Sequence, residues 1–289
     1  MENKNVKKIR VILPGGGVKG SFQLGVLHEL LKWDDYIIDA VYGSSVGALL
    51  SPFVANSNMG QVIDTFNKIK SINDIMKRRT IFGIPLPNWK LILLYFTLLK
   101  LGAYDSFKIV EDVLNSLTEK QCEIAKGKCH VVAFDIINNK ETWFSGDQLL
   151  DGIRCSSALW LAVPPIKYND TYYSDGGVTE VFPIDYILEH ELSSSFDGDY
   201  IFIDCSTRMM KKNTIDMDAI TLMNTLHSNA TLKVARDELI RLKSSLKNKL
   251  YVIKPEYDII TDPIDVNPNK MKELFNYGCK KGKEFLNNM

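Results

Sequence analysis

The sequence predicts an α/β protein with three layers, in which helices cover both faces of a mostly parallel central sheet. Short apolar runs of strand length alternate with longer segments whose apolar residues recur every three to four positions. The first two predicted strands each lead through a glycine-containing turn into a helix, at Gly15-Gly16-Gly17 and at Gly43-Ser44-Ser45. Strands joined through helices in this way are typical of parallel sheets.

The expected elements of the first half follow from length and periodicity. Strands are short and continuously apolar, whereas helices carry an apolar stripe, as Val62, Phe66 and Ile69 do. In chain order we expect a strand over 8–14, a helix over 20–33, a strand over 38–43, a helix over 46–56, one helix over 59–76 and a helix over 106–117.

The second half continues the alternation of strands and helices. Asn138-Asn139 is typical of a turn, so a hairpin is expected around it, and Pro164-Pro165 ends the helix that precedes it. In chain order we expect strands over 129–137 and 141–144, a helix over 147–159, a strand over 200–205, a helical segment over 215–246 with a break near residue 229, a strand over 250–253 and a helix over 269–286.

The chain has 289 residues, 45% of them apolar, so it can bury a sizeable core without disulfides. We expect a single domain over 1–289, with the motifs in about 8–205 and a C-terminal helical part over about 211–289 that completes the fold. Lys and Arg together number 35, as do Asp and Glu, which argues against a nucleic-acid partner. Nothing in the pattern indicates an oligomeric state.

Cysteine usage and apolar segments bear on where the protein acts. The five cysteines are widely spaced and lack a C-x-x-C pair, which indicates reduced thiols in a cytoplasmic protein, and no secretory signal is expected.

The most apolar stretch, 81–101, has only the nine residues 91–99 between Lys90 and Lys100, far short of the ~20 that span a bilayer. It is either a buried helix or a flap over an acyl pocket or a lipid surface. The basic region 233–249 has three open interpretations: it binds a membrane surface, it binds a partner, or it is only exposed to water.

The segment Gly43-Ser44-Ser45-Val46-Gly47 follows an apolar strand and precedes a small, apolar helix start. A strand, a sharp turn and a helix place the hydroxyl of Ser45 at the tip of the turn, which is the geometry of a nucleophile elbow. Glycine is needed two positions to either side because a side chain there would clash with the tight backbone. The alternative is a glycine-rich turn without chemistry.

The glycines of the first turn, Gly15, Gly16 and Gly17, can aim their backbone N–H groups at one anion, and the helix start favours negative charge there. One candidate anion is a dinucleotide pyrophosphate, because these glycines and Gly20 satisfy G-x-G-x-x-G. That fingerprint needs an acidic residue at the end of the second strand, whereas Asp39 lies at its start.

The other candidate anion is the oxyanion of an ester attacked by Ser45. The ends of adjacent parallel strands lie on one edge of a sheet, so the amides of Gly15, Gly16, Gly17 and Val46 would converge on the reacting carbonyl. This single hypothesis accounts for both glycine motifs.

A serine nucleophile needs a general base. Among the histidines His28, His130, His190 and His227, none has the sequence setting of a triad histidine, although Ser45, then Asp175 or Asp204, then His227 satisfies a known chain order.

The remaining candidate base is Asp175. The following Gly176-Gly177 indicates a tight turn that leaves the carboxylate at the end of a strand, and the alternative is a common Asp-Gly turn.

Four ordered blocks resemble the patatin-like phospholipase family. They are the glycine loop with Lys19 and Gly20, the Gly43–Gly47 elbow, the segment from Ser156 to Pro165, and Asp175-Gly176-Gly177. The resemblance covers roughly residues 8–183. It implies a parallel-sheet α/β/α hydrolase with a Ser–Asp dyad, and no motif is placed in the last third.

Carried onto this sequence, the resemblance implies that Ser45 is the nucleophile and Asp175 the base, with Gly16 and Gly17 as oxyanion donors. Lys19 stands where the family carries Arg or Lys, and would steady the loop or meet a lipid phosphate. The family acts on fatty acyl esters of phospholipids and neutral lipids without calcium. We therefore expect a lipid substrate at a membrane surface, peripheral membrane contact, and neither a metal nor a cofactor.

Two departures from the family pattern are Trp160, in place of a proline, and Thr179-Glu180, where asparagines are frequent. Three other functions stay open at this point. They are a dinucleotide-binding oxidoreductase, a soluble esterase that does not act on lipids, and a lipid-binding protein without catalysis.

Overall fold

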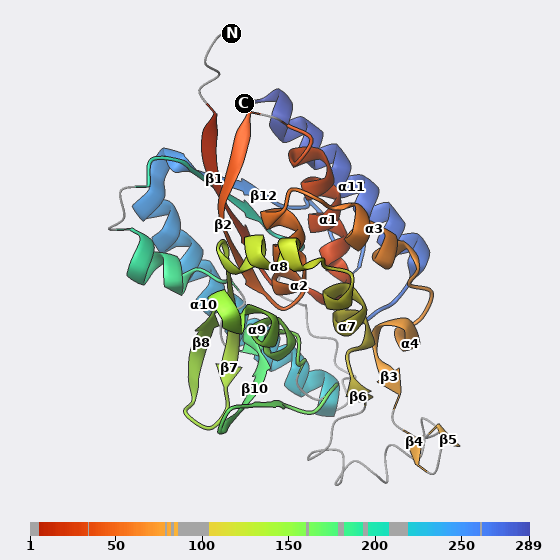
Figure 1. Cartoon of the computed structure of the whole chain (residues 1–289). Helices are drawn as coiled ribbons and strands as arrows, with labels where there is room; N and C mark the ends of the chain where they lie inside the picture. Colours follow the sequence, from red (N-terminus) through yellow and green to blue (C-terminus); the bar gives the residue numbers. More distant parts are fainter. Residues whose placement is uncertain are drawn as a thin grey trace.

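The computed structural model describes residues 6–33, 35–78, 80–81, 84–85, 104–159, 162–178, 182–192, 196–207, 219–260 and 262–289. Its centre is one sheet with strand order β12-β11-β1-β2-β7-β10-β9, and β8 pairs with β7 (Figure 1). The strands are β1 (Lys7–Leu13), β2 (Tyr36–Ser44), β7 (Cys129–Asp135), β8 (Lys140–Phe144), β9 (Ile166–Tyr168), β10 (Thr171–Asp175), β11 (Asp199–Ile203) and β12 (Leu250–Ile253).

The sheet is parallel in its centre and antiparallel at one end. β12, β11, β1, β2 and β7 pair in parallel, whereas β8 and β10 pair antiparallel with β7, and β9 pairs antiparallel with β10. Ser44, the last residue of β2, pairs with Val132, and Asp175, the last residue of β10, pairs with Ala133. β7 therefore lies between the two strand ends that carry the candidate site.

Helices cover both faces of this sheet, and the alternation along β1 divides the core between them. Val11 and Leu13 lie in the larger apolar cluster together with Phe22, whereas Ile12, between them, lies in a second cluster with Leu242. In Figure 1 the sheet lies between α10 on one side and α1 and α11 on the other. The expected three-layer, mostly parallel architecture is confirmed.

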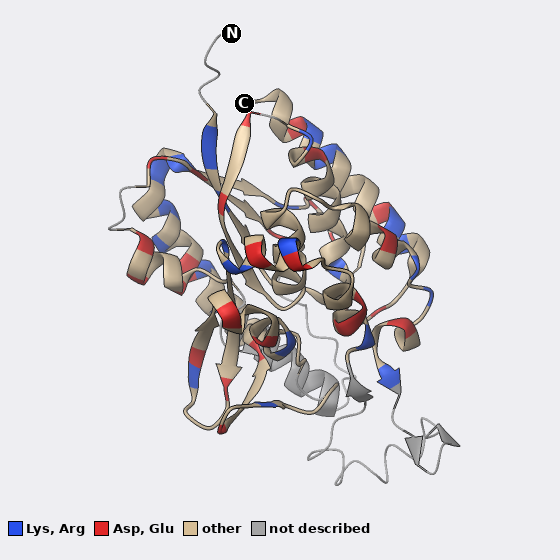
Figure 2. Ribbon diagram, in the orientation of Figure 1, with Lys and Arg blue, Asp and Glu red and all other residues tan. Residues whose placement is uncertain are grey.

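The helices are mostly short, and basic and acidic residues are interspersed over them (Figure 2). Two small ribbons, β3 (Lys77–Arg78) with β6 (Tyr104–Ser106) and β4 (Thr80–Ile81) with β5 (Ile84–Pro85), lie outside the main sheet. The helices are α1 (Gly20–Leu30), α2 (Val46–Ala55), α3 (Gly60–Asn67), α4 (Ile72–Ile75), α7 (Lys108–Asn115), α8 (Glu119–Lys126), α9 (Leu149–Ser156), α10 (Ala219–Leu246) and α11 (Pro268–Asn287).

The single helix expected over 59–76 is wrong, because the structure divides it into α3 and α4. Ser71 begins α4, and its backbone N–H donates to the carboxylate of Asp74 at 2.9 Å in a capping box. The extended backbone of this N-cap interrupts the helix, although the apolar period continues across the break. The break expected near residue 229 is also wrong, since α10 is continuous.

Helix α11 packs along α1 through glycines (Figure 1). A Cβ atom at Gly25 would lie 2.0 Å from the carbonyl oxygen of Phe275, and one at Gly278 would lie 2.2 Å from that of Phe22. The two backbones approach this closely only because both positions lack a side chain. The C-terminal helix thus buries the face of α1 on which Gly25 lies.

The apolar stretch 81–101 and its two interpretations lie almost wholly outside the described residues, as do Trp160 and Thr179-Glu180. Among the helices that the structure describes, none is both long and apolar enough to span a bilayer.

Candidate active site

Ser45 lies between the end of β2 and the start of α2, in a backbone conformation that L-residues rarely adopt, with φ 54° and ψ −121°. A Cβ atom at Gly43 would lie 2.7 Å from the backbone of Ala48, and one at Gly47 would lie 1.9 Å from the carbonyl oxygen of Leu13. Both flanking glycines are therefore required by the close approach of α2 to the strands. The turn that the motif predicts is present.

The hydroxyl of Ser45 donates a hydrogen bond to the Asp175 carboxylate at 2.6 Å. Asp175 is the last residue of β10, and its other carboxylate oxygen accepts from the Gly177 backbone N–H at 2.8 Å. The tight turn formed by the glycines after Asp175 supplies this second bond. Two residues 130 positions apart in the sequence thus come into direct contact.

Asp175 is only 3% exposed. Burial raises the pKa of its carboxyl to about 6, against the opposing effect of the hydrogen bonds from Ser45 and Gly177. The group is therefore ionised at neutral pH, yet it is a stronger base than an aspartate in water. This is the combination that a general base acting on a serine hydroxyl needs.

The end of α9 and the loop that follows it hold both members of the pair. The backbone N–H of Ser45 donates to the Ser156 hydroxyl at 2.9 Å, and the backbone N–H of Asp175 donates to the Ala158 carbonyl at 2.9 Å. The Ser174 hydroxyl donates to the same carbonyl at 3.0 Å. Ser156 and Ala158 belong to the segment from Ser156 to Pro165 that resembles the family. The residue types in that segment do not predict these contacts with the backbone of Ser45 and Asp175.

The glycine loop packs directly on the elbow. A Cβ atom at Gly15 would lie 3.0 Å from the Cβ of Ser45, and Gly17 has φ +57°. Within the described part of the chain, the backbone N–H groups of Gly16, Gly17 and Val46 donate to no protein acceptor. They are the donors that an oxyanion hole beside Ser45 would use.

Residues from distant parts of the chain fix this loop. Gln23, fully buried in α1, donates through Nε2 to the carbonyls of Pro14 at 2.9 Å and Ile203 at 3.0 Å. The backbone N–H of Val18 donates to the Pro263 carbonyl at 2.9 Å. These contacts cannot be predicted from the sequence, because a single glutamine or proline carries no positional signal.

Beneath the loop, Cys205 donates from Sγ to the Gly15 carbonyl at 3.4 Å, and a Cβ atom at Gly16 would lie 2.1 Å from that sulfur. The buried thiol occupies the space that a side chain at Gly16 would fill. Packing against Cys205 therefore requires a glycine at position 16, independently of any role of its backbone amide.

Lys19 is close enough to Asp258 to affect its ionisation. Burial alone would raise the pKa of Asp258, but hydrogen bonds from Thr207 and Ser206 and the positive charge of Lys19 lower it. The positive charge of Lys19 therefore acts on a carboxylate of the C-terminal segment.

Most of the other sequence candidates contact residues other than Ser45. The His130 ring packs against the rings of Tyr42 and Tyr186, with centroids 5.3 and 4.8 Å away. Asp39, the residue that a dinucleotide site would need, pairs with Arg10 at 2.8 Å. His28 lies against Phe275, and His190 lies against Tyr186. The Asp204 carboxylate accepts a hydrogen bond from the backbone N–H of Ser206. His227 lies in α10, and its side chain is outside the described residues.

Among the residues that the structure describes, no three His, Cys, Asp or Glu side chains are grouped so that they could hold a metal ion.

A sequence model of the family described as patatin-like phospholipase matches residues 11–188. This span is more than half of the chain and contains the glycine loop, the elbow and Asp175. The chain belongs to the patatin-like phospholipase family. Strands β11 and β12 and helices α10 and α11 lie beyond the matched span, yet Ile203, Cys205 and Pro263 contact the glycine loop or the start of α1.

Two curated relatives of this chain differ in how much of it they cover. The probable lipid hydrolase 463L of Invertebrate iridescent virus 6 is 31% identical over 99 residues, which are 32% of this chain and 34% of the viral protein. The uncharacterized protein YqhO of Bacillus subtilis strain 168 is 24% identical over 294 aligned positions, 95% of this chain and 97% of YqhO. Among solved structures, VipD from Legionella pneumophila has a TM-score of 0.48 and 13% identity, covering 98% of this chain and 67% of VipD.

Proposed function

We propose that this protein is a calcium-independent lipid acyl hydrolase that cleaves fatty acyl esters through an acyl-enzyme on Ser45. The observation that carries the proposal is the 2.6 Å hydrogen bond from the strained elbow serine to the buried Asp175. Membership of the patatin-like phospholipase family and the printed name of the viral relative support lipids as the substrate class.

In the first step, Asp175 accepts the hydroxyl proton while Oγ of Ser45 forms a bond to the ester carbonyl carbon. The negative charge on the carbonyl oxygen is stabilised by the amides of Gly16, Gly17 and Val46, each such donor contributing about 3 kcal/mol in known oxyanion holes. The bond between the carbonyl carbon and the alcohol oxygen then breaks, Asp175 gives the proton to that oxygen, and the acyl group stays on Ser45 while the alcohol leaves.

In the second step, a water molecule gives a proton to Asp175 and attacks the acyl carbonyl carbon. The bond between that carbon and Oγ of Ser45 breaks, Oγ takes the proton back from Asp175, and the fatty acid leaves. Lys19 steadies the glycine loop or binds a lipid phosphate. No step requires a histidine or a metal.

Fatty-acid release in the presence of a calcium chelator tests this proposal. Phospholipid vesicles, a triglyceride emulsion and a short, soluble ester are offered to the wild type, Ser45→Ala and Asp175→Asn, with folding checked by circular dichroism. We expect release from a lipid substrate, and a loss of about 100- to 10,000-fold in either variant. His227→Gln should retain activity.

Each alternative gives a different result in the same assay. Activity on the soluble ester alone would assign a non-lipid esterase, and a requirement for calcium would contradict the proposed chemistry. Full activity of Asp175→Asn together with complete loss in His227→Gln would replace the dyad by a Ser–acid–His triad.

A further inference from the structure

Two isoleucines and a tyrosine are exposed together at the turn of the β7–β8 hairpin. Ile136 is 40% exposed, Ile137 64% and Tyr172 44%. The backbone N–H of Ile136 donates to the Tyr172 carbonyl at 2.9 Å, so the start of β10 lies directly beside the turn. These three residues, which we call the hairpin patch, expose apolar side chains at a turn, where polar residues are the rule.

A buried carboxylate holds the turn that carries the hairpin patch. Oδ1 of the buried Asp135 accepts from the backbone N–H groups of Ile137 and Asn138, both at 3.0 Å. The Thr171 hydroxyl donates to the same oxygen at 2.7 Å. Because these hydrogen bonds fix the backbone of the turn, the exposure of Ile137 belongs to an ordered structure.

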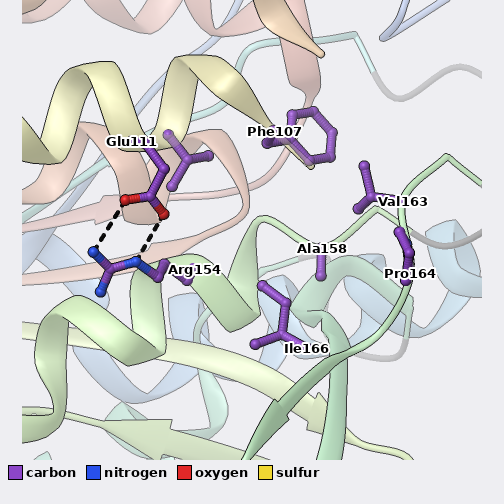
Figure 3. Close-up of a pocket in the computed structure, with 8 residues that line it drawn as sticks. Phe107, Glu111, Arg154, Ala158, Val163, Pro164 and Ile166 are labelled. Atoms are coloured by element: carbon purple, nitrogen blue, oxygen red, sulfur yellow. Dashed lines mark hydrogen bonds and ion pairs between the residues drawn. The ribbon is translucent and has the colours of Figure 1, made fainter. Parts of the chain in front are cut away.

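Strand β9 adds a lysine beside the patch. Lys167 is exposed and lies opposite Tyr172 in the antiparallel pair, so the two side chains leave the same face of the sheet. The other face of β9 is packed, since Ile166 lines a cavity of about 90 Å³ together with Ala158 and Val163 (Figure 3). The alternation along β9 therefore fixes Lys167, and with it Tyr172, on the outer face.

The hairpin patch lies at the edge of the sheet that carries the candidate nucleophile. Strands β2 and β7 are parallel, and Ser44, which precedes Ser45, pairs with Val132. From Val132, β7 continues to Asp135 and the turn follows, so the patch lies beyond Ser45 in the direction in which both strands run. In Figure 1 this is the lower end of β7 and β8, away from the two chain termini. A surface that meets the patch therefore faces the edge of the sheet on which Ser45 lies.

We infer that the hairpin patch docks the protein onto a lipid surface, an inference that rests on the proposed hydrolase activity. The side chains of Ile136 and Ile137 enter the region of the upper acyl chains, and Tyr172 stays at the level of the headgroups. Aliphatic side chains gain free energy on leaving water, and tyrosine is favoured at the boundary between headgroups and hydrocarbon.

The charges beside the patch indicate which lipid surface it fits. Within 136–140 and 167–172 the charged residues are Lys140, Lys167 and Asp170, all of them exposed. Their charges nearly cancel, so the patch neither needs nor repels an anionic surface. The surface that it fits is zwitterionic, such as phosphatidylcholine, and binding comes from the apolar side chains.

Flotation with phosphatidylcholine vesicles tests this inference in the Ser45→Ala background, in which the proposed hydrolysis does not consume the lipid. The parent variant should float with the vesicles. Adding Ile137→Ser should lower the partition coefficient about tenfold, because the burial of most of an isoleucine side chain is lost. Adding Ile137→Leu instead keeps the apolar area and should retain binding.

Ile37→Ser is the matched control. Ile37 is 52% exposed and lies near the start of β2, at the opposite edge of the sheet. In the same background this substitution removes the same side chain and should leave the partition coefficient unchanged. Equal binding by the Ile137→Ser and Ile37→Ser variants would overturn the inference, and so would a parent variant that does not float.

The outcomes separate docking from the proposed function. If Ser45 of the wild type does not react with a fluorophosphonate and no ester is cleaved, the proposed function fails, while flotation still decides whether the patch binds lipid. If Ser45 reacts and esters are cleaved, but Ile137→Ser floats as the parent does, docking through the patch is overturned.

Two further results would assign other contacts and overturn the inference. Binding that requires phosphatidylserine, disappears at high salt and ignores Ile137→Ser would place the membrane contact on the exposed lysines of α10, Lys233, Lys243 and Lys247. A dimer in solution that Ile137→Ser dissociates would make the hairpin patch a surface for a second copy of this chain, and sedimentation velocity measures this.

Discussion

At the scale of single residues, the ionisation of Asp175 controls the proposed chemistry. Its carboxyl has a pKa raised to about 6 by burial, and only the ionised form accepts a proton from Ser45. We expect kcat/KM to be constant above this pKa and to fall about tenfold per pH unit below it. A pH–rate profile on a soluble ester checks this. Activity that stays constant down to about pH 4, near the usual aspartate pKa, would contradict the raised value.

The same buried charge affects stability. Because the pKa of Asp175 is higher in the folded state than in the unfolded chain, folding is opposed once pH rises above the unfolded value of ~3.9, and the penalty is complete above about 6. Asp175→Asn removes this charge and can keep the hydrogen bonds to Gly177 and Ser45. It should be inactive, yet more stable at pH 8 by an amount on the order of 1–3 kcal/mol.

Denaturant unfolding at several pH values measures that difference. The advantage of Asp175→Asn should shrink as pH falls below about 6 and vanish near pH 4. A variant that is less stable than wild type at every pH would show that the charged carboxylate stabilises the fold.

At the scale of elements, the glycine loop is held by α1 and by the chain beyond the family match. Gln23 ties the ends of β1 and β11 together, so Gln23→Met should leave two buried carbonyls without their donor and let the loop shift. We expect a loss of about 1–3 kcal/mol in stability. We also expect kcat to fall about tenfold with little change in KM, because oxyanion donors act in the transition state.

Gln61→Met is the matched control for this prediction. Gln61 also donates through Nε2 to a backbone carbonyl, that of Ser116 at 3.0 Å, but on α3. Its replacement should lower stability without lowering kcat. Equal kcat values for the two variants would show that Gln23 contributes to folding alone.

At the scale of the whole molecule, the C-terminal helix α11 completes the layer that contains α1. Gly278→Ala places a Cβ atom 2.2 Å from the Phe22 carbonyl oxygen and forces the helices apart, so we expect a destabilisation of roughly 1–3 kcal/mol. Gly127→Ala, where a Cβ atom would lie 3.7 Å from its nearest neighbour, should change stability by less than about 0.5 kcal/mol. Chemical denaturation of both variants measures this, and equal stabilities would contradict the close packing of α1 on α11.

The sequence predicts those features that local rules determine. The elbow glycines, the strand before Ser45 and the glycine turn after Asp175 follow from backbone sterics. Helix α8 was not predicted, although Thr118 and Gln121 form a capping box that can be read in the sequence. The contacts of Ser156, Gln23 and Pro263 join segments that are far apart in the chain. Neither the spacing of apolar residues nor the amino-acid composition predicts which distant residues contact each other.

The most direct test of the Ser–Asp dyad is covalent labelling with a fluorophosphonate, followed by mass-spectrometric mapping of the modified peptide in the wild type and in Asp175→Asn. The wild type should carry one adduct, on Ser45, and Asp175→Asn should react about 100- to 10,000-fold more slowly while remaining folded. An adduct on another residue, or an Asp175→Asn variant that reacts at the wild-type rate, would contradict the assignment of Ser45 as nucleophile and Asp175 as its base.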